Sequence, residues 1–238
     1  MSKLLLILFS LAALFQNSNN PGISFDNLIT RIRDQKISKA EALKEFTKDI
    51  ASTEDYCFKQ KIKNYNSQEW VFPLKGYSVR SIGGKNGSGY VVNGYNFFDG
   101  NKHTGHPAHD IFINDRNQDC IDDKTKMPVE VLSISGGIVI GVEKSWEEKS
   151  DLRGGRYIWI YDPSSKVLFY YAHNSEVKVN AGDVVKPGDV IAFVGRTGLN
   201  AFNKRSPTHL HLMCLRLDNT GIPVPYSIYK ELLKMKKK

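Results

Sequence analysis

The stretch His209-Leu210-His211-Leu212-Met213-Cys214-Leu215 combines two imidazoles with an alternating apolar pattern. Such alternation is typical of a β-strand, in which successive side chains point to opposite faces. The pattern directs Leu210, Leu212 and Cys214 toward a core and turns His209 and His211 together to the other face. Two imidazoles on one strand face favour a metal or catalytic site over a solvated surface.

A second stretch, His106-Pro107-Ala108-His109-Asp110, supplies donors of the same kind. Neutral imidazole and carboxylate oxygen are preferred ligands of zinc, and a catalytic zinc takes three protein ligands. His106, Asp110 and either His209 or His211 would complete such a set. His109 is a further candidate ligand, although we expect it to be an outer hydrogen-bond partner of the site or a solvated side chain.

The centre of the chain is filled by short β-branched and aromatic runs bounded by glycine, proline and serine. Their spacing predicts an antiparallel sheet folded on itself, and the lack of a helix-length periodic segment among them excludes a doubly wound α/β fold. We expect residues 69–74 to form a strand before these runs and residues 184–194 to continue the sheet after them. The runs themselves are residues 129–131, 134–142, 157–161 and 167–171.

The N-terminal part of the chain has the period of helices. Apolar positions form a helical stripe in residues 25–34, and Ser38 with Glu41 makes a capping box. The box predicts a second helix from Lys39 to about Ile50. Near the other end, residues 225–234 predict one short helix before a basic end.

Residues 4–15 form an apolar run that is too short to span a membrane, which takes about 20 residues. We interpret it as part of a secretory signal peptide, so the mature protein is expected in the periplasm, in the cell envelope or outside the cell. An uncleaved anchor is the alternative, because no Ala-x-Ala site precedes the polar residues 16–20.

The formal net charge of +8 suits an acidic partner. The basic residues are scattered and match no nucleic-acid-binding motif, so we expect no nucleic acid partner and favour peripheral association with an anionic envelope surface. Cys57, Cys120 and Cys214 are too far apart in sequence for a structural zinc cluster. Export would permit a disulfide, for which the pattern leaves Cys57 and Cys120 as the candidate pair, but the sequence does not decide whether they pair.

Five motifs follow one another in an order that resembles the M23 family of zinc metallopeptidases, the LytM or lysostaphin type of peptidoglycan endopeptidase. The similarity extends from about Trp70 to Leu217. The motifs are His106-x-x-x-Asp110, Tyr171-Ala172-His173, the glycine-punctuated residues 182–191, Gly195-Arg196-Thr197-Gly198 and His209-Leu210-His211.

This resemblance implies a mainly β fold, an antiparallel sheet of the M23 peptidase (duplicated hybrid motif-like) type with a small N-terminal helical segment. It divides the chain into a signal peptide (1–20), a helical accessory segment (21–66), the peptidase domain (67–220) and a basic C-terminal tail (221–238). It also implies that residues 83–101 wall a substrate groove. One departure is Ala108, where the family commonly has glycine.

The resemblance further implies Zn²⁺ bound by His106, Asp110 and His211, with His173 and His209 as the catalytic pair that activates water and stabilises the tetrahedral intermediate. The expected activity is hydrolysis of peptide bonds in peptidoglycan stem or cross-link peptides. The alternative is a non-catalytic envelope protein of the same fold that binds or activates a cell-wall hydrolase.

Residues 115–126 superficially resemble a calcium-binding loop. Cys120 stands where the sharp turn requires glycine, and Lys126 stands where a bidentate glutamate is required. We therefore interpret this segment as an acidic insertion.

Overall fold

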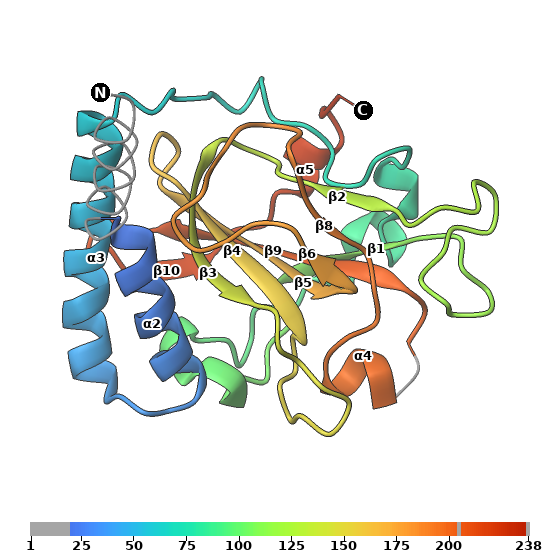
Figure 1. Cartoon of the computed structure of the whole chain (residues 1–238), viewed down its shortest axis with the longest axis horizontal. Helices are drawn as coiled ribbons and strands as arrows, with labels where there is room; N and C mark the ends of the chain where they lie inside the picture. The colour runs from blue at the N-terminus through green and yellow to red at the C-terminus, as the bar shows by residue number, and fades with distance from the viewer. Residues whose placement is uncertain (1–19, 204–205, 237–238) are drawn as a thin grey trace, which may run out of the picture.

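A computed structural model describes residues 20–203 and 206–236 of the chain. The predicted signal peptide falls almost entirely on residues 1–19, which lie outside the described residues. The fold is mainly antiparallel β with two long helices at its N-terminal end, as predicted (Figure 1).

A seven-stranded antiparallel sheet forms the centre of the molecule in the order β1-β9-β5-β4-β3-β7, with β10 also paired to β9. Its strands are β1 (Ala108–Phe112), β3 (Gly137–Glu143), β4 (Arg156–Asp162), β5 (Val167–Asn174), β7 (Val184–Val185), β9 (His209–Leu217) and β10 (Pro223–Pro225). A second, three-stranded sheet has the order β2-β8-β6, from β2 (Glu130–Leu132), β6 (Glu176–Val177) and β8 (Val190–Phe193).

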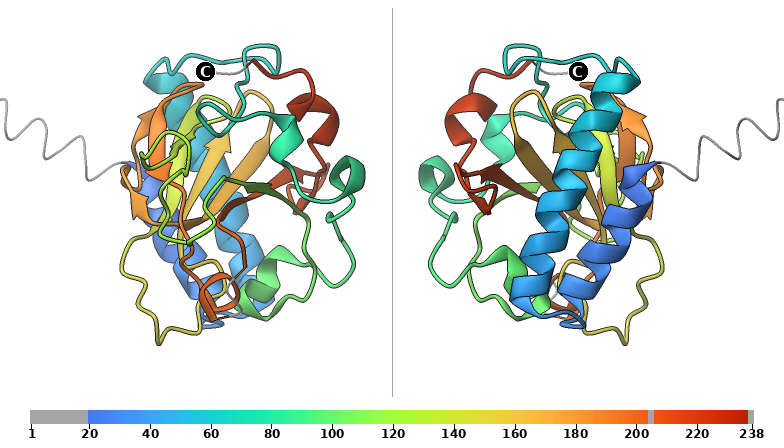
Figure 2. Two further views of the ribbon diagram at one scale, coloured as in Figure 1. Left: turned by 90° about the vertical axis from the view of Figure 1, so that its right-hand side faces the viewer. Right: turned by 90° about the vertical axis from the view of Figure 1, so that its left-hand side faces the viewer.

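Helices α2 (Pro21–Arg33) and α3 (Lys39–Lys59) cover one face of the large sheet (Figure 2). Their apolar stripes pack against side chains of β3, β4, β5 and β9, which form one core. The opposite face of the sheet packs in a second core with side chains of β2 and β8. The molecule therefore has three layers, with the large sheet in the middle.

Local sequence signals account for the ends of both helices. Asn20 caps α2 by accepting from the Gly22 amide at 3.0 Å, and its own amide donates to the Gly182 carbonyl at 2.9 Å, which fixes the helix to a turn beside the large sheet. The predicted capping box of Ser38 and Glu41 begins α3, as expected. The helix continues to Lys59, past the predicted end near Ile50, because Thr53 and Cys57 extend its buried face.

Short elements complete the fold. The segments around the site hold the 3₁₀ turns η1 (Val79–Ser81), η2 (Lys85–Gly87) and η3 (Phe97–Lys102) and the short helix α4 (Leu199–Asn203). Helix α5 (Tyr229–Leu232) is shorter than predicted, and its Leu232 is buried in the second core. Among the described residues, no helix is both long and apolar enough to cross a bilayer.

Two strand predictions are corrected. Residues 69–74 form no regular strand, because Val71 and Leu74 each make an isolated bridge to a different partner, Lys236 and Val131. Residues 184–194 do not continue a single sheet either, since β7 joins the large sheet and β8 joins the small one.

The candidate pair Cys57 and Cys120 forms no disulfide, because all three cysteines are free thiols. Cys57 lies on the buried face of α3, whereas Cys120 lies in the loop between β1 and β2, where its amide donates to Asp115 at 2.8 Å. Burial raises the pKa of the Cys57 thiol to about 11. Cys214 shares the core with Leu210 and Leu212, as the alternation predicted.

The helix layer depends on an aromatic cluster around Phe46, which has no exposed surface and makes edge contacts with Phe25, Phe97 and Phe98. We expect Phe46→Ala to lower the free energy of unfolding by about 3–5 kcal/mol, because it leaves a cavity among rigid rings. Phe58→Ala is the matched control on the same helix, since Phe58 is 84% exposed and its loss should change stability by less than about 0.5 kcal/mol. Urea unfolding measures the free energy of unfolding of both variants, and an equal loss in the two would contradict this packing.

Candidate metal centre

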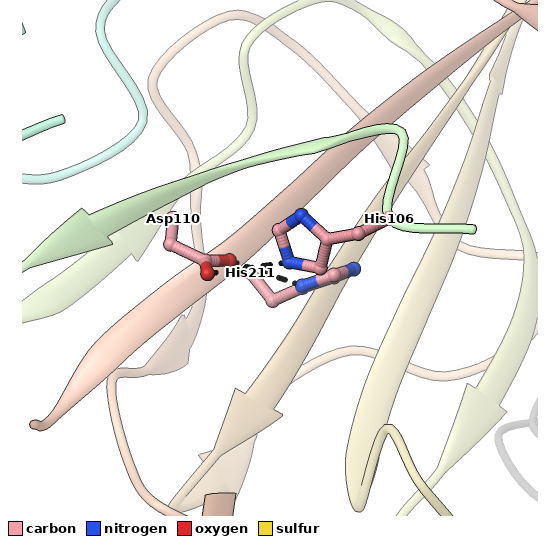
Figure 3. Close-up of side chains that lie close together, drawn as sticks. All are labelled: His106, Asp110 and His211. Carbon is pink, nitrogen blue, oxygen red and sulfur yellow. Dashed lines mark hydrogen bonds and ion pairs between the residues drawn. The ribbon is translucent and has the colours of Figure 1, made fainter. Parts of the chain in front are cut away.

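The pairing of β1 with β9 brings together two residues that lie 101 positions apart in sequence. Asp110 and His211 are directly opposite each other in this antiparallel ladder, so both side chains project from the same face. Nδ1 of His211 lies 3.1 Å from Oδ1 of Asp110 (Figure 3).

His106 reaches the same point from the segment that leads into β1. Its backbone pairs with Val91 through two hydrogen bonds of 2.8 Å, and its Nε2 lies 3.2 Å from Oδ2 of Asp110. Nδ1 of His106 is 3.0 Å from the Gly89 carbonyl oxygen, which can only accept. Nδ1 therefore carries a proton, and Nε2 faces Asp110, to which it donates when the ring is protonated and beside which it offers a lone pair when the ring is neutral.

His209 projects from the same face of β9 as His211, as the alternation predicted. Its Nδ1 donates to the Pro207 carbonyl at 2.7 Å, which leaves Nε2 facing Asp110 Oδ1 at 3.8 Å. The Pro207 carbonyl therefore fixes the tautomer of His209, with its free lone pair toward the cluster.

His173 lies at the end of β5 with φ = 67°, a left-handed conformation that is uncommon outside glycine and is often found at functional sites. Its amide donates to the Gly154 carbonyl at 2.9 Å, and its Nδ1 donates to the Thr197 carbonyl at 2.7 Å. The ring centroid of His173 lies 4.9 Å from that of His209 and 5.4 Å from that of His211. The backbone turn thus brings the imidazole into the cluster.

The Gly195-Arg196-Thr197-Gly198 motif serves to orient His173. The Thr197 side chain donates to the Asn174 carbonyl at 2.8 Å and accepts from the Arg156 amide at 2.9 Å, so its own carbonyl is held in place. Gly198 has φ = 104°, and a Cβ there would lie 2.3 Å from the Arg153 carbonyl oxygen. Glycine is required at this close approach.

The electrostatics keep Asp110 ionised and the deeper imidazoles neutral. Burial alone would raise the pKa of Asp110, but hydrogen bonds from His106 and His211 outweigh burial and hold the pKa well below its usual value. The hydrogen bond to Asp110 raises the pKa of His106. Burial, with the neighbouring imidazoles, lowers the pKa of His173 well below its ordinary value, and burial also lowers the pKa of His211.

The donor set fits a divalent metal ion. One ligand atom from each of His106, Asp110 and His211 lies within 4.8 Å of the other two. Two imidazoles and one carboxylate are a set that zinc accepts, and the Gly89 carbonyl orients His106 in the way that outer hydrogen bonds orient metal-binding histidines. The two other imidazoles, of His173 and His209, stand beside this trio.

His109 does not belong to this cluster, and the expectation of an outer partner of the site or a solvated residue is wrong. It alternates with Asp110 along β1, so its ring points to the opposite face of the sheet. There it is only 3% exposed, stacks on Tyr90 and lies 3.2 Å from the Ser227 hydroxyl through Nε2. Burial lowers its pKa to about 4.

The loop that resembled a calcium site is anchored to the cluster instead. The Asp115 carboxylate accepts from the Thr208 hydroxyl at 2.6 Å and from the amides of Asp119 and Cys120 at 3.1 and 2.8 Å. Thr208 directly precedes His209. Asp115 therefore connects this long loop to the start of β9.

The cluster opens into a cleft of about 390 Å³. Sequence reasoning missed part of its lining, because α2 contributes Ile29, Ile32 and Arg33 and thus borders the cleft. The helical period marked Ile29 and Ile32 only as buried residues and did not single out Arg33. Residues 83–101, expected to wall a groove, line this cleft through Tyr95, Phe97, Gly100 and Asn101, and a smaller hollow of about 150 Å³ beside His106 through Gly83, Gly84, Gly87 and Gly89.

Residues 116–222 match the sequence model of peptidase family M23. The match contains His173, His209 and His211. It begins after His106 and Asp110, which β1 and the segment before it place next to His211. This part of the chain is therefore similar to peptidase family M23, and the predicted resemblance is confirmed.

Solved structures with similar folds include a putative glycyl-glycine endopeptidase LytM from Ruminococcus gnavus, 24% identical over 92% of this chain and 84% of that one, with a TM-score of 0.47. The antimicrobial peptidase lysostaphin from Staphylococcus simulans is 21% identical over 69% of this chain, with a TM-score of 0.42, and this chain spans 53% of its length. A zinc-containing peptidase from Vibrio cholerae is 21% identical over 74% of this chain and 41% of that one, with a TM-score of 0.42.

The two histidines of the first motif provide a matched test of the metal centre. We expect His106→Phe to weaken zinc binding by more than about 100-fold, since even the loss of an outer hydrogen-bond partner costs 10- to 100-fold. His109→Phe should keep one zinc per chain, because that ring stacks on Tyr90 on the far side of β1 and its Nδ1 has no hydrogen-bond partner among the described residues. Competition with a zinc-chelating dye measures both affinities, and the reverse order would place His109 in the metal site.

Proposed function

We propose that the protein is a zinc metalloendopeptidase that hydrolyses peptide bonds in the stem or cross-link peptides of peptidoglycan. The observation that carries this proposal is the convergence of His106, Asp110 and His211 with two further imidazoles, His173 and His209, in the lining of one cleft. The match of residues 116–222 to peptidase family M23 supports the reaction class. The substrate class is taken from the resemblance of the motif set to that family.

His106, Asp110 and His211 would hold the zinc ion. When bound, zinc would act as a Lewis acid that polarises the scissile carbonyl and makes the attacking water more acidic. The ionised Asp110 supplies the negative charge of the ligand set, and the pairing of β1 with β9 holds this carboxylate against His211 before any ion binds.

His173 and His209 are placed to move protons. Each has Nδ1–H bound to a backbone carbonyl, so each presents the lone pair of Nε2. The low pKa of His173 keeps this imidazole neutral at physiological pH and therefore able to accept the proton of the attacking water. An imidazole that has accepted this proton becomes a donor to the oxyanion and then to the leaving amine.

Export of the protein is part of the same proposal. The apolar run of residues 4–15 has the length of a signal-peptide core, and cell-wall peptides lie outside the cytoplasmic membrane. All five histidine and aspartate positions of the family pattern are filled, which favours the catalytic interpretation over a non-catalytic envelope protein.

Variants separate metal binding from proton transfer. His211→Ala should lose zinc, whereas His209→Ala and His173→Ala should keep zinc and lose about 10²- to 10⁴-fold in turnover, the range typical of a lost general acid or base. Zinc content comes from atomic absorption and turnover from mass spectrometry of fragments released from purified sacculi. Zinc retained by His211→Ala and lost from His209→Ala would reverse the two roles.

Metal removal distinguishes the enzyme from a non-catalytic protein of the same fold. We expect a chelator to abolish fragment release from sacculi and an equimolar addition of zinc to restore it, because the three ligand residues alone leave the scissile carbonyl unpolarised. Buffer exchange without chelator is the control. If the zinc-loaded protein releases no fragments, the alternative of a protein that binds or activates a hydrolase replaces this proposal.

A further inference from the structure

The cleft beside the metal centre contains an arginine that has no carboxylate partner among the described residues. Arg153, in the loop between β3 and β4, lines the cleft and is partly buried. One guanidinium nitrogen, Nη1, donates to the His103 carbonyl. A guanidinium has five N–H donors, so most of them are left for another acceptor.

Arg153 is held at both of its ends. Its amide donates to the Asn101 side chain at 3.2 Å, and the Asn101 amide group donates back to the Asp151 carbonyl at 3.2 Å. The His103 carbonyl, which accepts from the guanidinium, belongs to a residue whose ring packs edge-on against Tyr95 with centroids 4.7 Å apart. The side chain is therefore oriented without a counter-ion, which reduces the entropy lost when a ligand binds.

The other arginine of the cleft is fully engaged. Arg33 pairs with both oxygens of Asp34 at 2.7 and 3.1 Å and with Glu143 at 2.8 Å. Asp110 is the only carboxylate among the described residues that line the cleft, and it faces the metal-site imidazoles. The positive charge of Arg153 is thus unbalanced within the cleft.

A second donor lines the same cleft near both Gly154 and His211. Tyr170 lines the cleft, its ring centroid is 6.1 Å from that of His211, and its hydroxyl has no hydrogen-bond partner among the described residues. A Cβ at Gly154, the neighbour of Arg153, would lie 1.9 Å from this hydroxyl. The absence of a side chain at Gly154 therefore makes room for the Tyr170 hydroxyl. Burial raises the pKa of Tyr170 well above 10, so the hydroxyl remains a donor.

We propose that Arg153, together with the Tyr170 hydroxyl, binds a free carboxylate of the peptide substrate, so that the cleft selects acidic peptides over amidated ones. Guanidinium and carboxylate form strong charge-assisted pairs, and a preformed donor pair is suited to such a group. This inference rests on the proposed function for the nature of the ligand. The carboxylate can be the C-terminal one of the peptide or one on a side chain.

Equilibrium binding tests this assignment apart from hydrolysis. The probe is a synthetic cross-linked stem-peptide dimer in three forms, with all carboxylates free, with the C-terminal ones amidated and with the side-chain ones amidated. Binding is measured by calorimetry to the zinc-loaded His209→Ala protein, in which turnover is removed, with and without Arg153→Gln. The matched control is Arg80→Gln, because Arg80 is exposed and does not line the cleft.

We expect Arg153→Gln to weaken binding of the free form about tenfold or more, as loss of a charge-assisted hydrogen bond does, and Arg80→Gln to leave it unchanged. Tyr170→Phe should cause a smaller loss, and Arg153→Lys should keep part of the affinity. Amidation of the recognised carboxylate should weaken peptide binding to the His209→Ala protein. The same amidation should make no further difference when Arg153→Gln is also present. The amidated form that shows this pattern identifies the carboxylate that Arg153 binds.

Three outcomes would overturn the inference. The first is equal affinity for the free peptide of the His209→Ala protein with and without Arg153→Gln, and the second is an equal effect of amidation on both proteins. The third is that no form of the peptide binds. Circular dichroism and zinc content show whether each variant is folded. Release of fragments from sacculi by the wild-type protein then decides separately whether the proposed function stands.

Discussion

The antiparallel pairing of β1 with β9 is the contact on which the site depends. It places Asp110 directly across from His211 and turns both side chains to one face of the large sheet. If one strand slipped by one residue, Asp110 and His211 would no longer project from the same face, because strand side chains alternate. Leu210, Leu212 and Ile111, all fully buried on the other face, resist such a slip.

Backbone carbonyls then determine what the imidazoles can do. The carbonyls of Gly89, Thr197 and Pro207 accept from Nδ1 of His106, His173 and His209, so each ring directs its Nε2 toward the cluster. These carbonyls belong to loops that are fixed by their own hydrogen bonds, such as that from Thr208 to Asp115. The loops are therefore part of the chemistry of the site, since they select the tautomer.

The helices and the site share one face of the large sheet. Helix α2 packs on β3 and β4, while the ligand trio lies toward the β1 edge, and the cleft extends between them. This arrangement explains how Ile29, Ile32 and Arg33 come to border the cleft that His211 also lines. Helix α2 thus contributes both to the core and to the shape of the cleft.

The sequence by itself determined the antiparallel β class, the capping box that begins α3, the strand His209–Leu217 and the identity of the residues that meet at the cluster. These features depend on local period, local hydrogen bonds or a set of motifs, all of which are present in short stretches of chain. The tertiary structure alone decided four features. It placed His211 and not His209 opposite Asp110, and it buried His109 behind β1. It also made α2 a border of the cleft and divided β7 and β8 between two sheets. Each of these depends on register or packing between segments far apart in sequence, and local patterns do not specify which distant strand a residue will face.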